Sequence, residues 1–364
     1  MSYFRKGFHS KSWSGGRSSS IRDNIGRSLR QLKRSTTSKS NDPALDDSID
    51  ENIGSRYNSF SRSSIDSEDL CCSSNMLTYC SSKEGKMHSN EDRWVSMKTL
   101  SPEFMTYCDS KLHAKADIQE ACQFLSCTSL FAAIDGHDGA GCSQFLSENL
   151  ARMVVTCEAC YSTELLISDR LSEIMREVFV KMEKEFMQEA EKTNDTSGAC
   201  IVIVLCCGDW ICAGNAGDCL GVLYDHSKKI HYISKLHRSI IGEERARVEG
   251  AGGFIERGRV FGQMIPSRTI GDFDIKKSCP GAVIAEPYIT TLEIKKRKET
   301  LPIMILATDG LWDIYDAKMA CKAARKYLKQ KVLKDFAVDP SYIMCEYAVE
   351  GGTKDDVTTI IVKL

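Results

Sequence analysis

The chain has 364 residues, of which 42% are hydrophobic and 27% are charged, so it can bury one large core or two modest ones. Its formal net charge of −2 gives no indication of general nucleic-acid binding. Its 17 cysteines are too few for a chain of this length to indicate a small disulfide scaffold. Because no segment approaches the roughly 20 apolar residues of a membrane span and the polar start lacks the apolar core of a signal peptide, we expect an intracellular protein, cytoplasmic or nuclear.

Residues 1–80 differ in composition from the rest of the chain. They are rich in Ser, Arg, Asn and Asp and lack sustained apolar periodicity, so they cannot bury enough surface to offset the entropy lost on ordering. Residues 1–40 hold ten Lys or Arg against Asp23 alone, and residues 41–70 hold eight acids. The sequence therefore predicts a disordered tail. The alternative is a regulatory tail, because phosphate on hydroxyls such as those of Ser64–Asp69 would change the local field.

The hydrophobic pattern of residues 81–364 is that of one globular domain. An apolar run at 129–134 predicts a buried strand that ends at Asp135. Helical spacing over 139–155 and 163–190 predicts two helices, each with one buried face. Further short apolar runs predict an antiparallel meander and then two late strands, at 199–207, 210–214, 220–224, 230–233, 303–307 and 358–363. Because the helices and the strands are each grouped together, an α+β domain is favoured.

Carboxylates occur where these predicted strands end. Asp135 and Asp309 each follow a buried run and precede a glycine, and Asp355 lies just before the last strand. Asp218 falls between two strands, and Glu91 with its neighbour Asp92 lies just ahead of Trp94. Carboxylates that share a cleft repel one another unless cations neutralise them. Oxygen ligands without clustered His or Cys indicate magnesium, manganese or calcium in preference to zinc.

Each of these signals is weak by itself. An Asp-Gly pair after a strand is more often a turn, and His137 alone would more often be a structural or surface residue. Two hard cations about 4 Å apart can activate one water for attack on phosphorus. Spacing and composition therefore lead as far as a candidate acidic metal site.

In chain order, these segments resemble the type 2C family of metal-dependent serine/threonine protein phosphatases. The acidic motifs are similar at Asn90–Arg93, Phe131–Gly139, Leu306–Asp313 and Lys354–Thr358. The segments between them are similar too: Ser197–Ala199, Gly214–Asp218, Glu244–Val248, Gly252–Ile255, Arg259–Gly262, Ser267–Asp272 and Glu286–Pro287. The resemblance covers about residues 85–364 and implies two antiparallel β-sheets in a sandwich flanked by helix pairs, with two Mg²⁺ or Mn²⁺ ions in a cleft at one end.

The resemblance also implies roles for individual residues. Asp135 would bridge both ions, with Glu91 and the carbonyl of Gly136 on one ion and Asp309 and Asp355 on the other.

Three further roles follow from the same resemblance. Asp218 and Asp313 would hold a weaker third ion. His137 would be the general acid that protonates the leaving seryl or threonyl oxygen, since imidazole titrates near neutrality. Asp92 would hold the metal-ligating residues in place without contacting an ion itself. The implied partners are phosphorylated proteins, and we expect the enzyme to act as a monomer.

The sequence departs from the family pattern near Glu91. Met87 stands where the family usually has an arginine, whose planar fork grips the substrate phosphate. Lys86 is a tentative substitute, although a lysine cannot reproduce the fork. Leu236-His237 replaces the usual Asp-His, and residues 101–128 form a longer or less regular insertion than the family pattern predicts.

Three functions stay open at this stage. The leading interpretation is an active protein phosphatase, because the main metal ligands are retained. Met87 favours a pseudophosphatase that acts as a binding or scaffold module with little or no turnover. A phosphatase of small phosphorylated metabolites is the third interpretation, because an open metal site recognises only the phosphate group of its substrate.

Overall fold

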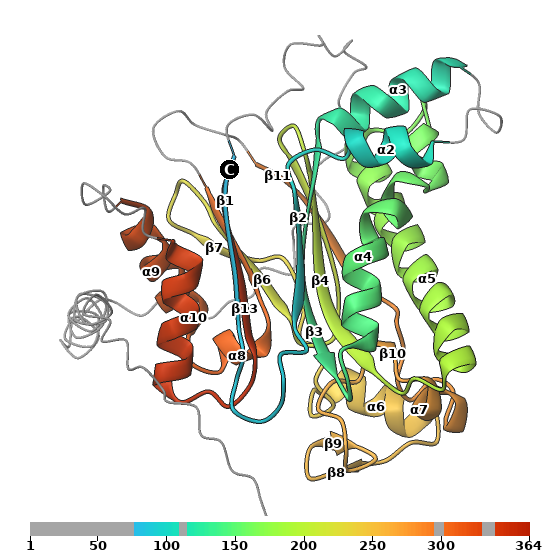
Figure 1. Cartoon of the computed structure of the whole chain (residues 1–364), viewed down its shortest axis with the longest axis vertical. Coiled ribbons are helices and arrows are strands. Elements are labelled where there is room, and N and C mark those ends of the chain that lie inside the picture. Colours follow the sequence, from blue (N-terminus) through green and yellow to red (C-terminus); the bar gives the residue numbers. More distant parts are fainter. Residues whose placement is uncertain (1–75, 109–114, 295–301, 330–338) are drawn as a thin grey trace, which may run out of the picture. The chain divides into compact units, whose positions relative to one another are not determined.

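The computed structural model describes residues 76–108, 115–294, 302–329 and 339–364. In this part of the chain two antiparallel sheets stack face to face, and helices cover the outer side of each (Figure 1). The first sheet has the order β1 (Leu77–Lys83), β13 (Val357–Lys363), β12 (Ile303–Ala307), β6 (Leu220–Tyr224) and β7 (Ile230–Tyr232). The second has the order β11 (Tyr288–Glu293), β5 (Trp210–Ala216), β4 (Gly198–Cys207), β3 (Thr128–His137) and β2 (Arg93–Met97). The predicted α+β sandwich is confirmed.

Successive side chains of β3 enter two different cores. Phe131 and Ala133 belong to the core between the sheets, where they meet residues of β12 and β13. Leu130, Ala132 and Ile134 point the other way, into a core shared with the helices on the second sheet. Because both faces of β3 and of its neighbour β4 are buried, their sequences are continuous apolar runs and not alternating ones.

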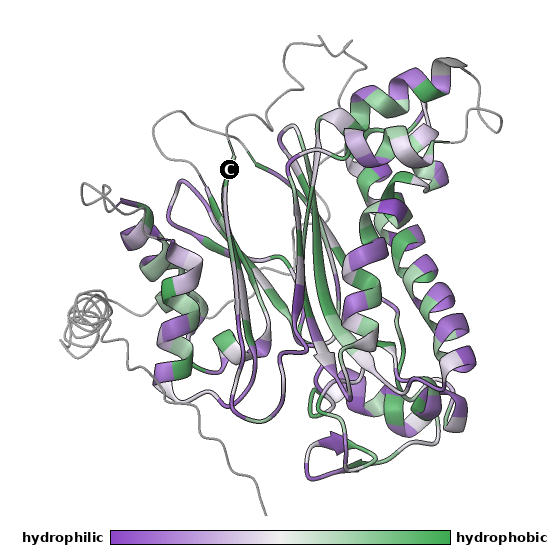
Figure 2. Ribbon diagram, in the orientation of Figure 1, coloured by the Kyte–Doolittle hydropathy of each residue, from purple (hydrophilic) through white to green (hydrophobic). Residues whose placement is uncertain are grey.

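Two groups of helices cover the sandwich. On the second sheet lie α4 (Gly141–Val155) and α5 (Ile167–Thr193), with the shorter α2 (Ser101–Tyr107), α3 (Lys115–Ser126) and η3 (Glu158–Tyr161). On the first sheet lie α9 (Ala317–Lys329) and α10 (Pro340–Gly351), next to the single turn α8 (Asp309–Trp312). Figure 2 shows hydrophobic residues along the strands and on the inner sides of α4 and α5. Both long predicted helices are therefore amphipathic elements that pack on a sheet.

A small lobe lies between β7 and β11 in the sequence. It contains α6 (Gly242–Gly250), α7 (Phe273–Ser278) and the two-stranded β8 (Ile255–Glu256) and β9 (Arg259–Val260). The short strand β10 (Ile270–Gly271) pairs with β4 and so ties the lobe to the second sheet. Val248, Val260 and Val283 contribute to a separate apolar cluster inside the lobe.

Two expectations about local structure need correction. The predicted tail reaches residue 80, but strand β1 already begins at Leu77, so the tail assignment is wrong for residues 77–80. The predicted meander is also wrong, because β5 and β6 belong to different sheets. The insertion at 101–128 holds two helices, α2 and α3. The tail up to residue 75 lies outside the described residues.

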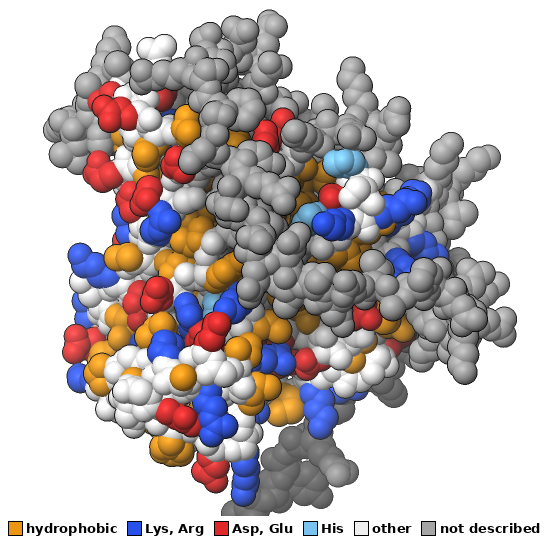
Figure 3. Space-filling view, turned by 180° about the vertical axis from the view of Figure 1, so that it is seen from behind, with side chains coloured by type: hydrophobic (Ala, Val, Ile, Leu, Met, Phe, Trp, Pro, Cys, Tyr) orange, Lys and Arg blue, Asp and Glu red, His pale blue; other side chains and the backbone are white. Residues whose placement is uncertain are grey.

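The described surface is mixed in character. In Figure 3, acidic and basic side chains are interspersed on the visible face. Large apolar side chains reach solvent at separate positions, among them Met87, Met105 and Phe254. Among the described residues, none of the helices combines the length and the hydrophobicity that a membrane crossing requires.

Candidate metal centre

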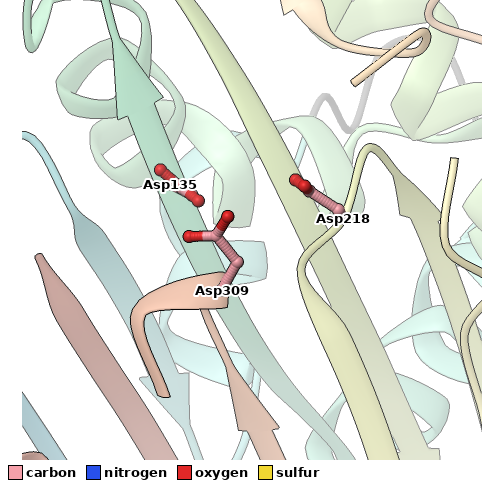
Figure 4. A group of neighbouring side chains, drawn as sticks. All are labelled: Asp135, Asp218 and Asp309. Atoms are coloured by element: carbon pink, nitrogen blue, oxygen red, sulfur yellow. The ribbon is translucent and has the colours of Figure 1, made fainter. Parts of the chain in front are cut away.

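Three aspartates from distant parts of the sequence meet at one end of the sandwich. Asp135 lies near the end of β3, Asp218 in the turn between β5 and β6, and Asp309 at the start of α8. One carboxylate oxygen from each lies within 4.8 Å of those of the other two. Figure 4 shows the three carboxylates turned toward a common space. The structure thus brings together three of the residues that the sequence singled out as metal ligands.

Two close backbone contacts position the chain after the first and the third aspartate. A Cβ atom at Gly136 would lie 2.5 Å from the carbonyl oxygen of Glu91, and one at Gly310 would lie 2.0 Å from that of Asp356. Both positions therefore require glycine. The two Asp-Gly pairs that looked like ordinary turns pack directly against the other acidic segments of the site.

Burial and mutual repulsion act on these carboxyl groups. Burial raises the pKa of Asp135 well above its usual value, and the carboxylates of Asp309 and Asp92 raise it further. Burial raises the pKa of Asp309 to about 8, with contributions from Asp218 and Asp355. A nearby cation removes this penalty and lets the groups ionise together. The donor atoms are all oxygen, so the residues present fit a hard cation such as Mg²⁺ or Mn²⁺.

The loop before β13 contributes two further aspartates. Asp355 lines the same pocket as the three central aspartates, and burial raises its pKa above the usual value. Asp356 is buried, and its carboxylate accepts hydrogen bonds from the backbone N–H groups of Gly85 (2.7 Å) and Glu91 (2.8 Å). Asp356 therefore ties the Glu91 segment to the site, a role that the sequence did not show.

Three other predicted residues lie around the central aspartates and not within their group. Glu91 has its carboxylate 4.0 Å from Nδ1 of His88. Asp92 is buried, accepts a hydrogen bond from the hydroxyl of Thr308 (2.9 Å), and has its pKa raised by burial to about 7. Asp313 is exposed just after α8. Asp92 therefore joins the Glu91 segment to the residue before Asp309, and its expected supporting role stays a prediction.

One positively charged side chain, that of Arg238, lies among these carboxylates. Arg238 donates from Nε to Asp218 Oδ2 (2.9 Å) and from a terminal nitrogen to Asp309 Oδ2 (3.3 Å). Sequence reasoning missed Arg238, since the segment before it carries no motif beyond Leu236-His237. His237 is part of the same arrangement, because its Nδ1 accepts a hydrogen bond from the backbone N–H of Gly217 (3.3 Å).

The predicted general acid has a carboxylate partner. Nε2 of His137 lies 2.9 Å from Oδ1 of Asp272, and both residues line the pocket with Asp135. Burial lowers the pKa of His137, but the charge and hydrogen bond of Asp272 raise it, and the net change is upward. Asp272 was noted only as part of a motif, because its approach to His137 depends on a contact between β3 and the lobe.

The segment before Glu91 differs from what the sequence indicated. Lys86 and Met87 are both exposed, and Lys86 makes a backbone hydrogen bond to Lys354 (2.9 Å). His88 is the residue that faces the acids: its Nδ1 lies 3.6 Å from Asp356 Oδ2. The structure therefore puts an imidazole, and not the ammonium of Lys86, next to the carboxylates.

The central aspartates open into a pocket of about 430 Å³. One wall consists of Asp135, His137 and Asp138 from β3 and the residues that follow it. The small lobe supplies the opposite wall, including Arg259, Gln263, Met264, Pro266 and Asp274. The small lobe therefore forms part of the pocket that contains the carboxylates.

Comparison with known proteins assigns the chain to a family. The model of the family described as protein phosphatase 2C matches residues 102–357, more than half of the chain. The chain belongs to the protein phosphatase 2C family. The resemblance read from the sequence motifs is thereby confirmed, and the acidic group occupies the place of a metal site in a metal-dependent family.

Curated relatives carry the same family name. Probable protein phosphatase 2C 32 from Oryza sativa subsp. japonica is 32% identical over 241 residues, which cover 65% of this chain and 58% of that protein. Probable protein phosphatase 2C 2 from Arabidopsis thaliana is 27% identical over 290 residues, which cover 79% of this chain and 66% of that protein. The chain thus spans only about 58 to 66% of the length of these phosphatase 2C relatives.

Solved structures show the same fold. A C. elegans sex-determining protein matches 79% of this chain with a TM-score of 0.64 at 20% identity, and 65% of that chain is covered. A serine-threonine phosphatase 2C from Toxoplasma gondii matches 79% of this chain with a TM-score of 0.61 at 16% identity, and 94% of that chain is covered. At such identities the likeness supports the phosphatase 2C fold.

Proposed function

We propose that this protein is a serine/threonine phosphatase that hydrolyses phosphoserine and phosphothreonine in other proteins with two Mg²⁺ or Mn²⁺ ions. The observation that carries the proposal is the group of Asp135, Asp218 and Asp309, whose oxygens lie within 4.8 Å of one another in a protein phosphatase 2C fold. No covalent intermediate is needed, because a water molecule is the nucleophile.

Five residues would hold the two catalytic ions. Asp135 would be shared between them, with Asp309 and Asp355 completing one site and Glu91 and the carbonyl of Gly136 the other. The shared pocket of the three aspartates and the direct contact between Gly136 and the Glu91 backbone support this assignment. When bound, the ions supply Lewis-acid activation of a water molecule and neutralise charge on the phosphoryl oxygens.

His137 would donate the proton that the leaving seryl or threonyl oxygen needs. Its Nε2 is engaged by Asp272, so Nδ1 is the atom that would carry the transferable proton. Asp272 orients the ring and favours the imidazolium form. In the same way, the buried Asp92 and Asp356 would hold the ligand-bearing segments in place.

The pocket supports a macromolecular substrate. The carboxylates lie in an open pocket with the lobe on one side, so a phosphorylated side chain can enter while its flanking peptide lies against Arg259 and Gln263. Lys86 is exposed and would add a positive charge without the planar fork of an arginine. His88, whose Nδ1 lies 3.6 Å from Asp356 Oδ2, adds a second cationic group when it is protonated.

Two observations favour the alternative of a pseudophosphatase. Met87 is exposed and offers no charge to a phosphate. Arg238 already bonds two of the carboxylates. A scaffold protein of this kind would bind phosphorylated partners with little turnover.

The test is an assay of the purified 364-residue chain with a phosphothreonine peptide, in Mn²⁺, in Mg²⁺ and in excess chelator. We expect turnover that needs the metal and that falls by more than about a hundredfold in Asp135→Asn and in Asp309→Asn. Asp169→Asn, an exposed change in the first turn of α5, serves as the matched control and should keep full activity.

Two results would overturn the proposal in different ways. Metal binding without turnover by the wild-type protein would establish the scaffold alternative. Sugar phosphates hydrolysed with a higher kcat/KM than the phosphopeptide would move the substrate class to small metabolites.

A further inference from the structure

The acidic centre contains an internal counter-ion. The guanidinium of Arg238 bridges Asp218 (Nε to Oδ2, 2.9 Å) and Asp309 (terminal nitrogen to Oδ2, 3.3 Å). The Asp218 side chain is almost fully buried, and only 29% of the Arg238 side chain is exposed. A planar fork that joins two carboxylates in a partly buried place is a strong and geometrically defined contact.

The segment that carries Arg238 is fixed to the turn that carries Asp218. The backbone N–H of His237 donates to the carbonyl of Gly217 (3.0 Å). Asn215 pairs with Lys235 through its amide, donating from Nδ2 (2.6 Å) and accepting at Oδ1 (3.0 Å). The backbone next to Arg238 is therefore fixed beside the Asp218 turn, and from there the guanidinium reaches both carboxylates.

One guanidinium cannot neutralise the negative charge of all three central aspartates. Asp135, Asp218 and Asp309 carry three negative charges when ionised, and Arg238 supplies one positive charge. Arg238 pairs with the second and the third of these residues, whereas Asp135 belongs to neither ion pair. A divalent cation can therefore bind between Asp135 and Asp309 while Arg238 stays on Asp218. A cation that binds Asp218 through Oδ2 must displace Arg238.

We propose that Arg238 competes with divalent cations for Asp218 and thereby weakens cation binding at this side of the centre. The resemblance to the type 2C family implies a weaker third ion at Asp218, and in this chain a guanidinium lies at that carboxylate. Arg238 stabilises the metal-free centre and raises the cation concentration needed to fill the Asp218 side. The inference rests on the proposed metal centre, but it concerns cation binding and not turnover.

The experiment is calorimetric titration of the metal-free 364-residue chain with MnCl₂, comparing wild type with Arg238→Met. Loss of the ion pair should either add one bound Mn²⁺ or tighten the weakest site by about tenfold or more. Arg152→Met is the matched control: Arg152 has a similar exposure (28%) and an ion pair with Glu185, but lies on α4 away from the carboxylates. It should leave Mn²⁺ binding unchanged.

Two further variants separate the possible causes. Arg238→Lys keeps the charge without the fork and should give an intermediate Mn²⁺ affinity. In Arg238→Met combined with Asp218→Asn, the gain should disappear, because the freed carboxylate is gone. Thermal unfolding in chelator establishes that each variant folds, and Arg238→Met should unfold at a lower temperature than Arg152→Met.

The outcomes distinguish this inference from the proposed function. If the wild type binds Mn²⁺ and Arg238→Met binds it no better, the competition is refuted and the metal centre stands. If only Arg238→Met binds Mn²⁺, the competition is supported and the proposed two-ion phosphatase is refuted for the wild type. If neither binds Mn²⁺, both are refuted.

Discussion

The imidazole Nε2 of His137 lies 2.9 Å from the carboxylate Oδ1 of Asp272. Asp272 is itself tightly held: its backbone N–H donates to the carbonyl of Ser197 (3.1 Å), and the hydroxyl of Thr269 donates to its other carboxylate oxygen. Its φ of +54° lies in the left-handed region, which is strained for a residue with a side chain. The strain persists because these contacts fix Asp272 where it can orient the ring of His137.

Replacing Asp272 should therefore impair the proton-donating step. For Asp272→Asn we expect kcat to fall by roughly tenfold to a hundredfold with little change in KM, since the amide cannot stabilise the imidazolium. Asp272 raises the pKa of His137. Because the proposed mechanism makes protonated His137 the proton donor, we expect activity to fall as pH rises through this pKa, and in the variant the fall should begin at lower pH. The measurement is kcat and KM as functions of pH.

A neighbouring aspartate provides the control for this change. Asp274 lines the same pocket from α7 and is exposed. Asp274→Asn should keep the wild-type pH profile. If Asp272→Asn kept that profile and its kcat as well, Asp272 would have no part in positioning His137.

The exposed Met87 should limit phosphate binding. Met87→Arg places a planar fork near the acidic site, and we expect KM for a phosphothreonine peptide to fall by about three- to tenfold while kcat changes little. Met105 has almost the same exposure (70% against 71%) but lies on α2, away from the site, so Met105→Arg controls for the added charge. An equal KM in both variants would show that the position of Met87 does not contribute to substrate binding.

The parts of the site that the sequence predicted lie on strands with strong local patterns. Asp135 and Asp309 could be found because each ends a fully buried apolar run, β3 or β12, whose pattern is visible in a short window. Their convergence could not be read from periodicity, which shows that a strand exists but not which sheet it joins. The crossing from β5 to β6 between sheets was missed for this reason.

Raised carboxyl pKa values should make the metal-free protein less stable at high pH. Burial raises the pKa of Asp92 to about 7 and that of Asp309 to about 8, whereas an unfolded carboxyl group titrates near pH 4. The folded state then binds more protons, so this contribution to stability is complete below about pH 4 and is lost as pH rises through these folded values.

The expected result is a lower unfolding temperature in chelator at pH 8.5 than at pH 5.5, by at least about 3 °C. Saturating Mn²⁺ should remove most of this difference, and Asp309→Asn should reduce it in chelator. Differential scanning calorimetry at several pH values measures the effect. An unfolding temperature in chelator that increases over this window would show that the carboxylates are not crowded in solution.

Residues that act through long-range contacts could not be predicted. Arg238 bonds aspartates 20 and 71 positions away, and Asp272 meets a histidine 135 positions away, so no local window shows either pair. The beginning of β1 was assigned to the tail because this edge strand is only partly buried and lacks a clear alternation. Local patterns thus predicted the elements and the ligand-bearing turns, and the fold supplied the partners.

The central claim is that Asp135 and Asp309 hold the catalytic cations. The most direct measurement is anomalous X-ray diffraction at the manganese edge from crystals of the 364-residue chain grown with MnCl₂. The proposed function predicts two anomalous peaks in the pocket, one of them bonded to both Asp135 and Asp309. Well-ordered crystals with no anomalous peak at these carboxylates, or with peaks only elsewhere on the protein, would contradict it.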